Sequence, residues 1–169
     1  MHPIFPGLTA LASLLAAPAA LAQSDGCSPT TAYAVRGEIV GLKDRTGRLL
    51  VELFAPTDDG FLKGDTRSQE HPTALRRLWI APPASGPVTL CLAAPAAGRY
   101  ALLVTHDRDG TQKFSVGKDG LALPGNTHLG RHRPQLMETL ISVDANSRPL
   151  TLRMQYLKGL AGFAPASDQ

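Results

Sequence analysis

Apolar residues fill both faces of one segment in the middle of the chain, residues 98–106 (GRYALLVTH). In an extended conformation, Tyr100, Leu102 and Val104 point to one side, and Ala101 and Leu103 point to the other. A run without a polar face is typical of a strand that is buried on both sides. We therefore expect this segment to be a central strand of a β-sheet.

Shorter segments with alternating apolar residues lie before and after the central one. They cover residues 33–42, 48–54, 74–80, 88–93, 135–143 and 150–157. The compact turn at 44–47 predicts that the first two form a hairpin, and residues 113–116 are expected to begin the strand that returns after the acidic turn at 107–110. The pattern predicts an all-β protein, a β-sandwich of about seven or eight antiparallel strands.

Two segments show no strand periodicity. Residues 67–73 are polar and are expected to be exposed, and residues 118–134 are expected to form a long loop. Loops of that length are uncommon inside compact domains and are often functional. The 14 prolines and 16 glycines of the chain agree with a protein of many turns and short strands.

The first 22 residues predict export. They contain no Asp, Glu, Lys or Arg, they include an apolar run from Leu8 to Ala17, and they end in small residues at Ala20 and Ala22. This is typical of a signal peptide that is cleaved near Ala22, although an uncleaved anchor or an unstructured start is the alternative. The expected location is periplasmic or secreted. No later stretch is apolar enough for a transmembrane span.

The remaining chain is divided by the same patterns into three parts. Residues 23–32 are expected to be an N-terminal arm, residues 33–158 a single β-sandwich domain, and residues 159–169 a flexible tail rich in Gly, Ala, Pro and Ser.

Cys27 and Cys91 are the two cysteines of the chain. In an oxidising compartment an isolated pair usually forms one disulfide, which here would fix the N-terminal arm to a strand. The alternative is a buried Cys91 and an exposed Cys27 thiol. Redox catalysis is not expected, because the sequence has no C-x-x-C pair.

Charge gives little indication of a specific partner. The chain carries 17 Lys and Arg against 14 Asp and Glu, a net charge of +3, and the basic residues are scattered. Nucleic-acid binding is therefore not expected. The expected partner is an unidentified protein or small ligand of the cell envelope.

A set of short motifs occurs in a characteristic order along the chain. They are Gly98, Tyr100 and Ala101; His106, Asp107 and Asp109; Lys113 and Phe114; Leu123, Pro124 and Gly125; and residues 150–156 (LTLRMQY). This order resembles an uncharacterised family of exported bacterial proteins, domain of unknown function 2141. The resemblance implies an immunoglobulin-like or prealbumin-like sandwich and an exported location. It implies no reaction.

Asp107 and Asp109 stand at alternate positions of the acidic turn, and alternate carboxylates on a turn can converge on a hard cation such as calcium. The turn does not complete an EF-hand, because Gly110 comes two places too early and Lys118 occupies the place of the last carboxylate. The other interpretation is a solvated turn in which the Asp side chains cap their own backbone. Calcium is the one cofactor that the sequence suggests.

Three histidines offer a transition-metal interpretation. His106 ends the central strand, and His128 and His132 lie in the loop 118–134, with Asp107 as a fourth ligand. Their spacing matches no zinc motif, so the alternative is that His106 is a strand-end residue with hydrogen bonds to the backbone. A hydrolase-like enzyme using His106 is a further alternative, although the sequence has no G-x-S-x-G elbow.

Arg131, His132 and Arg133 form a short basic cluster in the same loop. Such a cluster can bind a carboxylate or phosphate, and the alternative is a solvated loop with solubilising charge. The sequence as a whole predicts a non-catalytic binding or interaction module. Its expected ligand surface is the end of the sandwich that carries residues 106–110 and 118–134.

Overall fold

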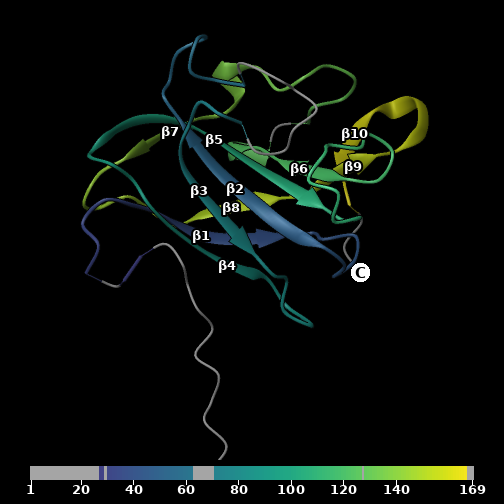
Figure 1. Ribbon diagram of the computed structural model, residues 1–169, viewed down its shortest axis with the longest axis horizontal. Coiled ribbons are helices and arrows are strands. Elements are labelled where there is room, and N and C mark those ends of the chain that lie inside the picture. The colour runs from purple at the N-terminus through teal and green to yellow at the C-terminus, as the bar shows by residue number, and fades with distance from the viewer. Residues whose placement is uncertain (1–26, 29, 63–70, 127, 167–169) are drawn as a thin grey trace, which may run out of the picture.

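The computed structural model describes residues 27–28, 30–62, 71–126 and 128–166, and the expected signal peptide lies outside them. Within these residues ten strands form two sheets, which confirms the all-β sandwich. Figure 1 shows the smaller sheet, with β1, β4 and β8, packed beside the larger sheet, with β2, β3 and β5.

The smaller sheet has the strand order β4-β1-β8. Its middle strand, β1 (Ala34–Val40), pairs antiparallel with β4 (Val88–Ala93) and parallel with β8 (Leu150–Arg153). The parallel pair departs from the expectation of a purely antiparallel sandwich.

The larger sheet is built around β5 (Gly98–Asp107), which confirms the predicted central strand. On one side β5 pairs with β2 (Arg48–Phe54), and β2 pairs with β3 (Ala74–Ile80). On its other side β5 pairs with β7 (Leu140–Val143) near its start and with β6 (Gly120–Ala122) near its end. The sheet continues from β6 through β9 (Gln155–Leu157) to β10 (Phe163–Pro165).

The core of the sandwich lies between the sheets and receives alternate residues from both. The smaller sheet contributes Val35, Ile39, Val88, Leu90, Leu92 and Leu152, and the larger contributes mainly Leu49, Val51, Leu53, Leu102, Val104 and Tyr156. A second apolar cluster covers the outer face of the larger sheet, which is why β5 has no polar face. It contains Phe54, Phe61, Ala101, Leu103, Leu121, Leu123, Leu129 and Phe163.

The predicted hairpin of residues 33–42 and 48–54 is wrong, because β1 and β2 belong to different sheets. Each strand directs one apolar face into the core of the sandwich, and the two faces meet the core from opposite sides. Alternation identifies a face that is buried, but it does not say to which sheet the strand belongs.

The strand that returns after the acidic turn is β6, at residues 120–122, and not the predicted segment 113–116. Backbone and side chains hold residues 108–118 in an irregular loop, in which the amides of Lys118 and Asp119 donate to the carbonyl of Ser115. We call residues 108–118 the acidic loop. The segment 118–134 therefore contains a strand and a 3₁₀ turn, Pro124–Asn126.

The last part of the chain also differs from the prediction. A 3₁₀ turn, Leu136–Glu138, occupies the start of the segment 135–143, and the segment 150–157 divides at Met154 into β8 and β9, which lie in different sheets. After the 3₁₀ turn Gly159–Ala161, residues 163–165 form β10, where a flexible tail was expected. Phe163 accounts for this order, because its side chain is buried in the outer apolar cluster.

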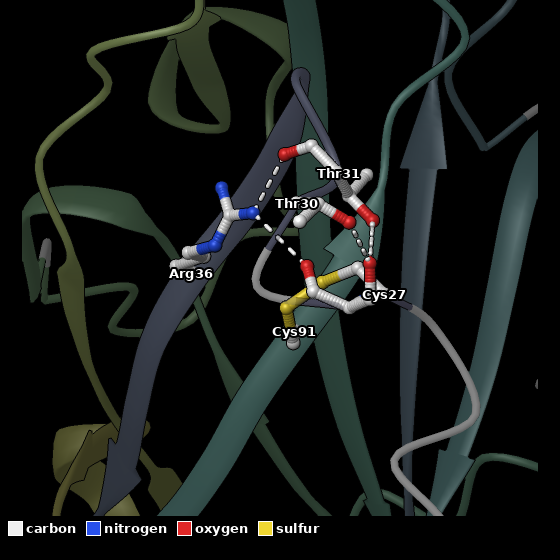
Figure 2. The surroundings of a disulfide bond; sticks show 6 residues. Cys27, Thr30, Thr31, Arg36 and Cys91 are labelled. Atoms are coloured by element: carbon white, nitrogen blue, oxygen red, sulfur yellow. Dashed lines mark hydrogen bonds between the residues drawn. A yellow bond between two sulfur atoms is a disulfide. The ribbon is translucent and has the colours of Figure 1, made fainter.

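Cys27 and Cys91 form a disulfide, as predicted, with their Cα atoms 5.6 Å apart. The bond fixes the segment before β1 to β4 (Figure 2). Nη2 of Arg36 strengthens the attachment, since it donates to the carbonyl oxygen of Thr31 at 2.7 Å. In the part of the chain that is described, no helix has the length and apolar character needed to span a membrane.

Candidate functional site

A cavity of about 580 Å³ opens on the outer face of the larger sheet, away from the sandwich core. Leu103 and Thr105 of β5 and Leu121 of β6 line it from the sheet. The remaining lining residues come from the segments that cover this face, and they are Leu62, His71, Phe114, Val116, Leu129, Gly130, Arg131, His132, Arg133, Pro134, Leu157, Gly162 and Phe163.

The far wall of the cavity is held by backbone pairing. Gly130 and Phe163 form an isolated bridge, in which the Phe163 amide donates to the Gly130 carbonyl at 2.6 Å and the Gly130 amide donates in return at 3.0 Å. The buried Gln155 side chain accepts the Leu129 amide at 3.0 Å. Gly162 permits this close contact, because a Cβ there would lie 2.1 Å from the Gly130 carbonyl oxygen. The wall is therefore a fixed part of the fold.

The cavity is mainly apolar, and one residue of its floor, Thr105, carries a buried hydroxyl that has no partner among the described residues. Thr105 is 5% exposed, and its Oγ1 has no hydrogen bond within the described residues. A buried hydroxyl without a partner is unfavourable by about 1–3 kcal/mol.

The predicted basic cluster lies at the cavity. Arg131, His132 and Arg133 are all exposed, and all three line the cavity. His132 is engaged locally, since its Nδ1 donates to the Arg133 carbonyl at 2.9 Å and its Nε2 lies 3.6 Å from Oε1 of Glu138. The two guanidinium groups have no hydrogen bond or ion pair to another described residue. They are therefore available to an anion.

A buried polar group beside the cavity was missed by the sequence analysis. His71, in the segment that was expected to be exposed, is 5% exposed and its Nδ1 donates to Oε2 of Glu52 at 2.6 Å. Oε1 of Glu52 accepts the His71 amide at 3.0 Å and Nε of Arg77 at 3.2 Å. Glu52 was the one residue that could have predicted this group from the sequence. Its carboxylate lies on the outer face of β2 between Leu50 and Phe54, which are apolar and buried, so it needs a buried polar partner.

Three carboxylates meet at the base of the acidic loop. The register pairs His106 with Gly120, so the next residues outward, Asp107 and Asp119, face one another. One oxygen of each of these residues and of Asp109 lies within 4.8 Å of the others. Asp107 and Asp119 are buried, at 0% and 1% exposure. Asp119 was not among the predicted residues, because its sequence context gives no sign that β6 brings it opposite Asp107.

Most of these carboxylate oxygens accept hydrogen bonds from the acidic loop. Asp119 accepts the Arg108 amide at 3.0 Å and the Ser115 amide at 2.7 Å, and Asp107 Oδ2 accepts the Gln112 amide at 3.2 Å. Burial, aided by the neighbouring carboxylates, nevertheless raises the pKa of Asp119. Asp107 Oδ1 is buried and has no hydrogen-bond partner in the described chain.

Asp109 faces solvent on the outer side of this group. Its Oδ1 accepts the Thr111 hydroxyl at 2.7 Å, and its Oδ2 lies 3.2 Å from Nζ of Lys118. The Thr111 hydroxyl and then the Lys118 ammonium lower the pKa of Asp109. The guanidinium of Arg108 points elsewhere and pairs with Asp44, which holds the pKa of that carboxyl well below its usual range.

His106 points to the opposite face of β5 and is fully buried. Its Nε2 lies 2.8 Å from the carbonyl oxygen of Thr46, which can only accept, so Nε2 carries the proton. Nδ1 therefore accepts the hydroxyl hydrogen of Tyr156 at 2.7 Å, and burial lowers the pKa of the imidazole. Both ring nitrogens are thus engaged within the fold.

The structure does not bring the predicted histidine ligands together. Within the described residues one group of three or more potential metal-ligand residues is found, and neither His106, His128 nor His132 belongs to it. His128 is exposed. Of the four predicted ligand or metal candidates, the structure joins Asp107 and Asp109 and adds Asp119 to them.

The chain matches a protein family described as "Uncharacterized protein conserved in bacteria (DUF2141)" over residues 38–151. It belongs to this family. The match begins within β1 and ends within β8, so it includes the acidic loop and the basic cluster. Three residues that line the cavity, Leu157, Gly162 and Phe163, lie beyond the matched range. No curated protein and no solved structure matches the chain.

Proposed function

We propose that this DUF2141 protein is a non-catalytic binding module of the cell envelope. Its ligand is a small molecule with an apolar body and an anionic group, which binds in the cavity on the outer face of the larger sheet. The observation that carries the proposal is the combination of mainly apolar walls with Arg131 and Arg133 at the same cavity.

The cavity is suited to a small molecule in size and lining. Ligand sites in proteins usually measure about 300–1,000 Å³ and are mainly apolar with a few polar groups, and this cavity measures about 580 Å³. Leu103, Leu121 and Phe163 offer apolar surface to the ligand body.

The charge at the cavity favours an anion. Arg131 and Arg133 have no acidic partner in the described residues, and the one nearby carboxylate contact, from Glu138, is to His132. A carboxylate, sulfonate or phosphate can accept two parallel hydrogen bonds from a guanidinium group, which gives orientation as well as affinity.

Two features support a non-catalytic role in an oxidising compartment. His106, the predicted catalytic candidate, is buried with both nitrogens bonded, so it offers none to a substrate. The Cys27–Cys91 disulfide and the uncharged, apolar residues 1–22 support export to the periplasm or the medium.

Two fluorescent dyes test the proposal. 8-Anilino-1-naphthalenesulfonate carries an anionic group, and N-phenyl-1-naphthylamine has a similar ring system without it. We expect saturable binding of both dyes, and competition by decanoate. Replacing both guanidinium groups, in Arg131→Gln with Arg133→Gln, should weaken the anionic dye about tenfold and leave the neutral dye unchanged.

Arg148→Gln is the matched control, because Arg148 is exposed and does not line the cavity. It should leave both dyes unchanged. The proposal fails if neither dye binds saturably, or if the control weakens the anionic dye as much as the double variant does. It also fails if self-association of the protein displaces the dyes, because the cavity would then belong to a second copy of the chain.

A further inference from the structure

We propose that Asp107, Asp109 and Asp119 form a binding site for one calcium ion at the base of the acidic loop. The site requires Asp119, which was not among the ligand candidates predicted from the sequence. It is a cation site in its own right, and it is separate from the cavity proposed above for the anion.

The spacing of the three carboxylates fits calcium. Calcium–oxygen distances of about 2.3–2.6 Å allow two ligand oxygens on the same ion to lie at most about 5 Å apart. One oxygen from each of the three residues lies within 4.8 Å of the others, so each pair of these oxygens is close enough to share one ion. Calcium takes oxygen ligands alone, and the group contains no nitrogen or sulfur ligand.

The charge balance also favours a divalent cation. Three carboxylates meet, and the Lys118 ammonium beside Asp109 Oδ2 balances one of them. The guanidinium of Arg108 is paired with Asp44 and does not reduce the charge further. Two of the carboxylates are buried, where a charge is costly unless it is paired, and a bound cation would pair with both.

A second observation points to a ligand independently of the clustering. Asp107 is 0% exposed, and its Oδ1 has no hydrogen-bond donor among the described residues, although its other oxygen accepts the Gln112 amide. A buried carboxylate oxygen normally accepts at least one hydrogen bond. A cation would satisfy this oxygen directly.

The ion would connect the two ends of the acidic loop. Asp107 precedes the first residue of the loop, Asp109 is its second residue, and Asp119 follows its last residue. Phe114 and Val116, within the loop, line the cavity. Calcium would thereby fix one wall of the cavity, and we expect it to raise the affinity for the anionic dye about fivefold. This last consequence rests on the proposed function, whereas the cation site does not.

Calorimetric titration of the chelator-treated protein with CaCl₂ tests the site. We expect one calcium per chain, a dissociation constant no weaker than the millimolar range of extracellular calcium modules, and a higher melting temperature with calcium. Asp107→Asn should abolish the heat of binding and the thermal shift. Asp58→Asn is the matched control, because Asp58 is exposed and outside the group, and it should bind calcium as the wild type does.

Lys118→Gln is a second variant that does not depend on a buried substitution, since 63% of the Lys118 side chain is exposed. Removal of the ammonium group should tighten calcium binding about threefold or more, because a second positive charge no longer competes with calcium for the Asp109 carboxylate. A structural ion pair without a cation site would give no calcium response in either form.

The proposal is overturned if the wild type shows neither heat nor a thermal shift at millimolar calcium, or if Asp107→Asn binds calcium as tightly as the wild type. Calcium binding without any dye binding would leave the cation site intact and remove the proposed function. Dye binding without calcium binding would leave the proposed function intact and remove the cation site.

Discussion

Tyr156 and His106 are joined side chain to side chain within the sandwich, with the tyrosine Oη 2.7 Å from Nδ1 of the imidazole. The same Oη accepts the Lys43 amide at 3.1 Å. Gly120 makes room for the ring, because a Cβ there would lie 2.3 Å from a Tyr156 ring atom. His106, one residue before the end of the central strand, is thus fixed by one strand of the same sheet and by the turn before β2.

Tyr156→Phe is expected to destabilise the protein by about 1–3 kcal/mol. The change leaves the buried Nδ1 of His106 without a donor and the Lys43 amide without an acceptor, while the ring still fills its place. Denaturant unfolding measures the effect. Tyr33→Phe, at a residue that is 37% exposed, is the control and should change stability by less than about 0.5 kcal/mol. Equal effects of the two substitutions would contradict the role given to the hydroxyl.

Because of His106, the free energy of unfolding should decrease as the pH is lowered below about 6.5. Burial lowers its pKa in the folded protein below 6.5, its ordinary value, so in this range the unfolded chain binds a proton that the native state does not. The stabilising contribution is complete above pH 6.5 and is lost as the pH falls toward the pKa of the folded state.

Asp119 acts in the opposite sense. Its raised pKa means that protonation stabilises the native state between the folded pKa and about 3.8, the ordinary value. Because the two groups have opposite effects on stability, the pKa of His106 is measured directly, by NMR titration of its ring protons in the folded protein. Those signals should titrate below pH 6.5, and a midpoint above 6.5 would be inconsistent with the buried, neutral ring.

Glu52→Gln should cost about 2–4 kcal/mol, because Glu52 is the shared acceptor for His71 and Arg77 and is 1% exposed. Thermal or denaturant unfolding provides the measurement. Glu38→Gln, on the half-exposed side of β1, is the control and should stay within about 0.5 kcal/mol of the wild type. A loss no greater than that of the control would show that the buried polar group does not hold residue 71 against the sheet.

Thr105→Val is expected to stabilise the ligand-free protein by about 1 kcal/mol. The substitution replaces a buried hydroxyl that has no partner in the described chain by a methyl group of similar size, and valine is well suited to a central strand. The melting temperature reports the change, with Thr151→Val on the exposed side of β8 as control. A lower melting temperature for Thr105→Val than for the control would mean that the hydroxyl already has a partner.

The sequence was sufficient for the sandwich, the central strand and the disulfide because each depends on a local or compositional signal. The two apolar faces of residues 98–106 require cover on both sides, wherever that cover comes from. The assignment of strands to sheets was not predictable in this way. Ile39 and Leu49 show the same alternation, although one enters the core from the smaller sheet and the other from the larger.

The candidate sites show the same division. Asp107 and Asp109 are neighbours in sequence, so their proximity was visible, whereas Asp119 reaches them through the pairing of His106 with Gly120. The comparison with an EF-hand placed Lys118 at the last ligand position, and Lys118 is one residue before Asp119. The partnership of Glu52 with His71 depends on how a covering segment lies on the outer face, which no local pattern encodes.

Amide NMR spectra recorded during a titration with decanoate test the central claim most directly. We predict saturable shifts at Thr105, Leu121, Leu129 and Arg131 around the cavity, and no shift at Leu90 in the sandwich core. Saturable shifts that avoid these four residues, or the absence of any shift at concentrations that displace the anionic dye, would contradict the assignment of this cavity as the ligand site.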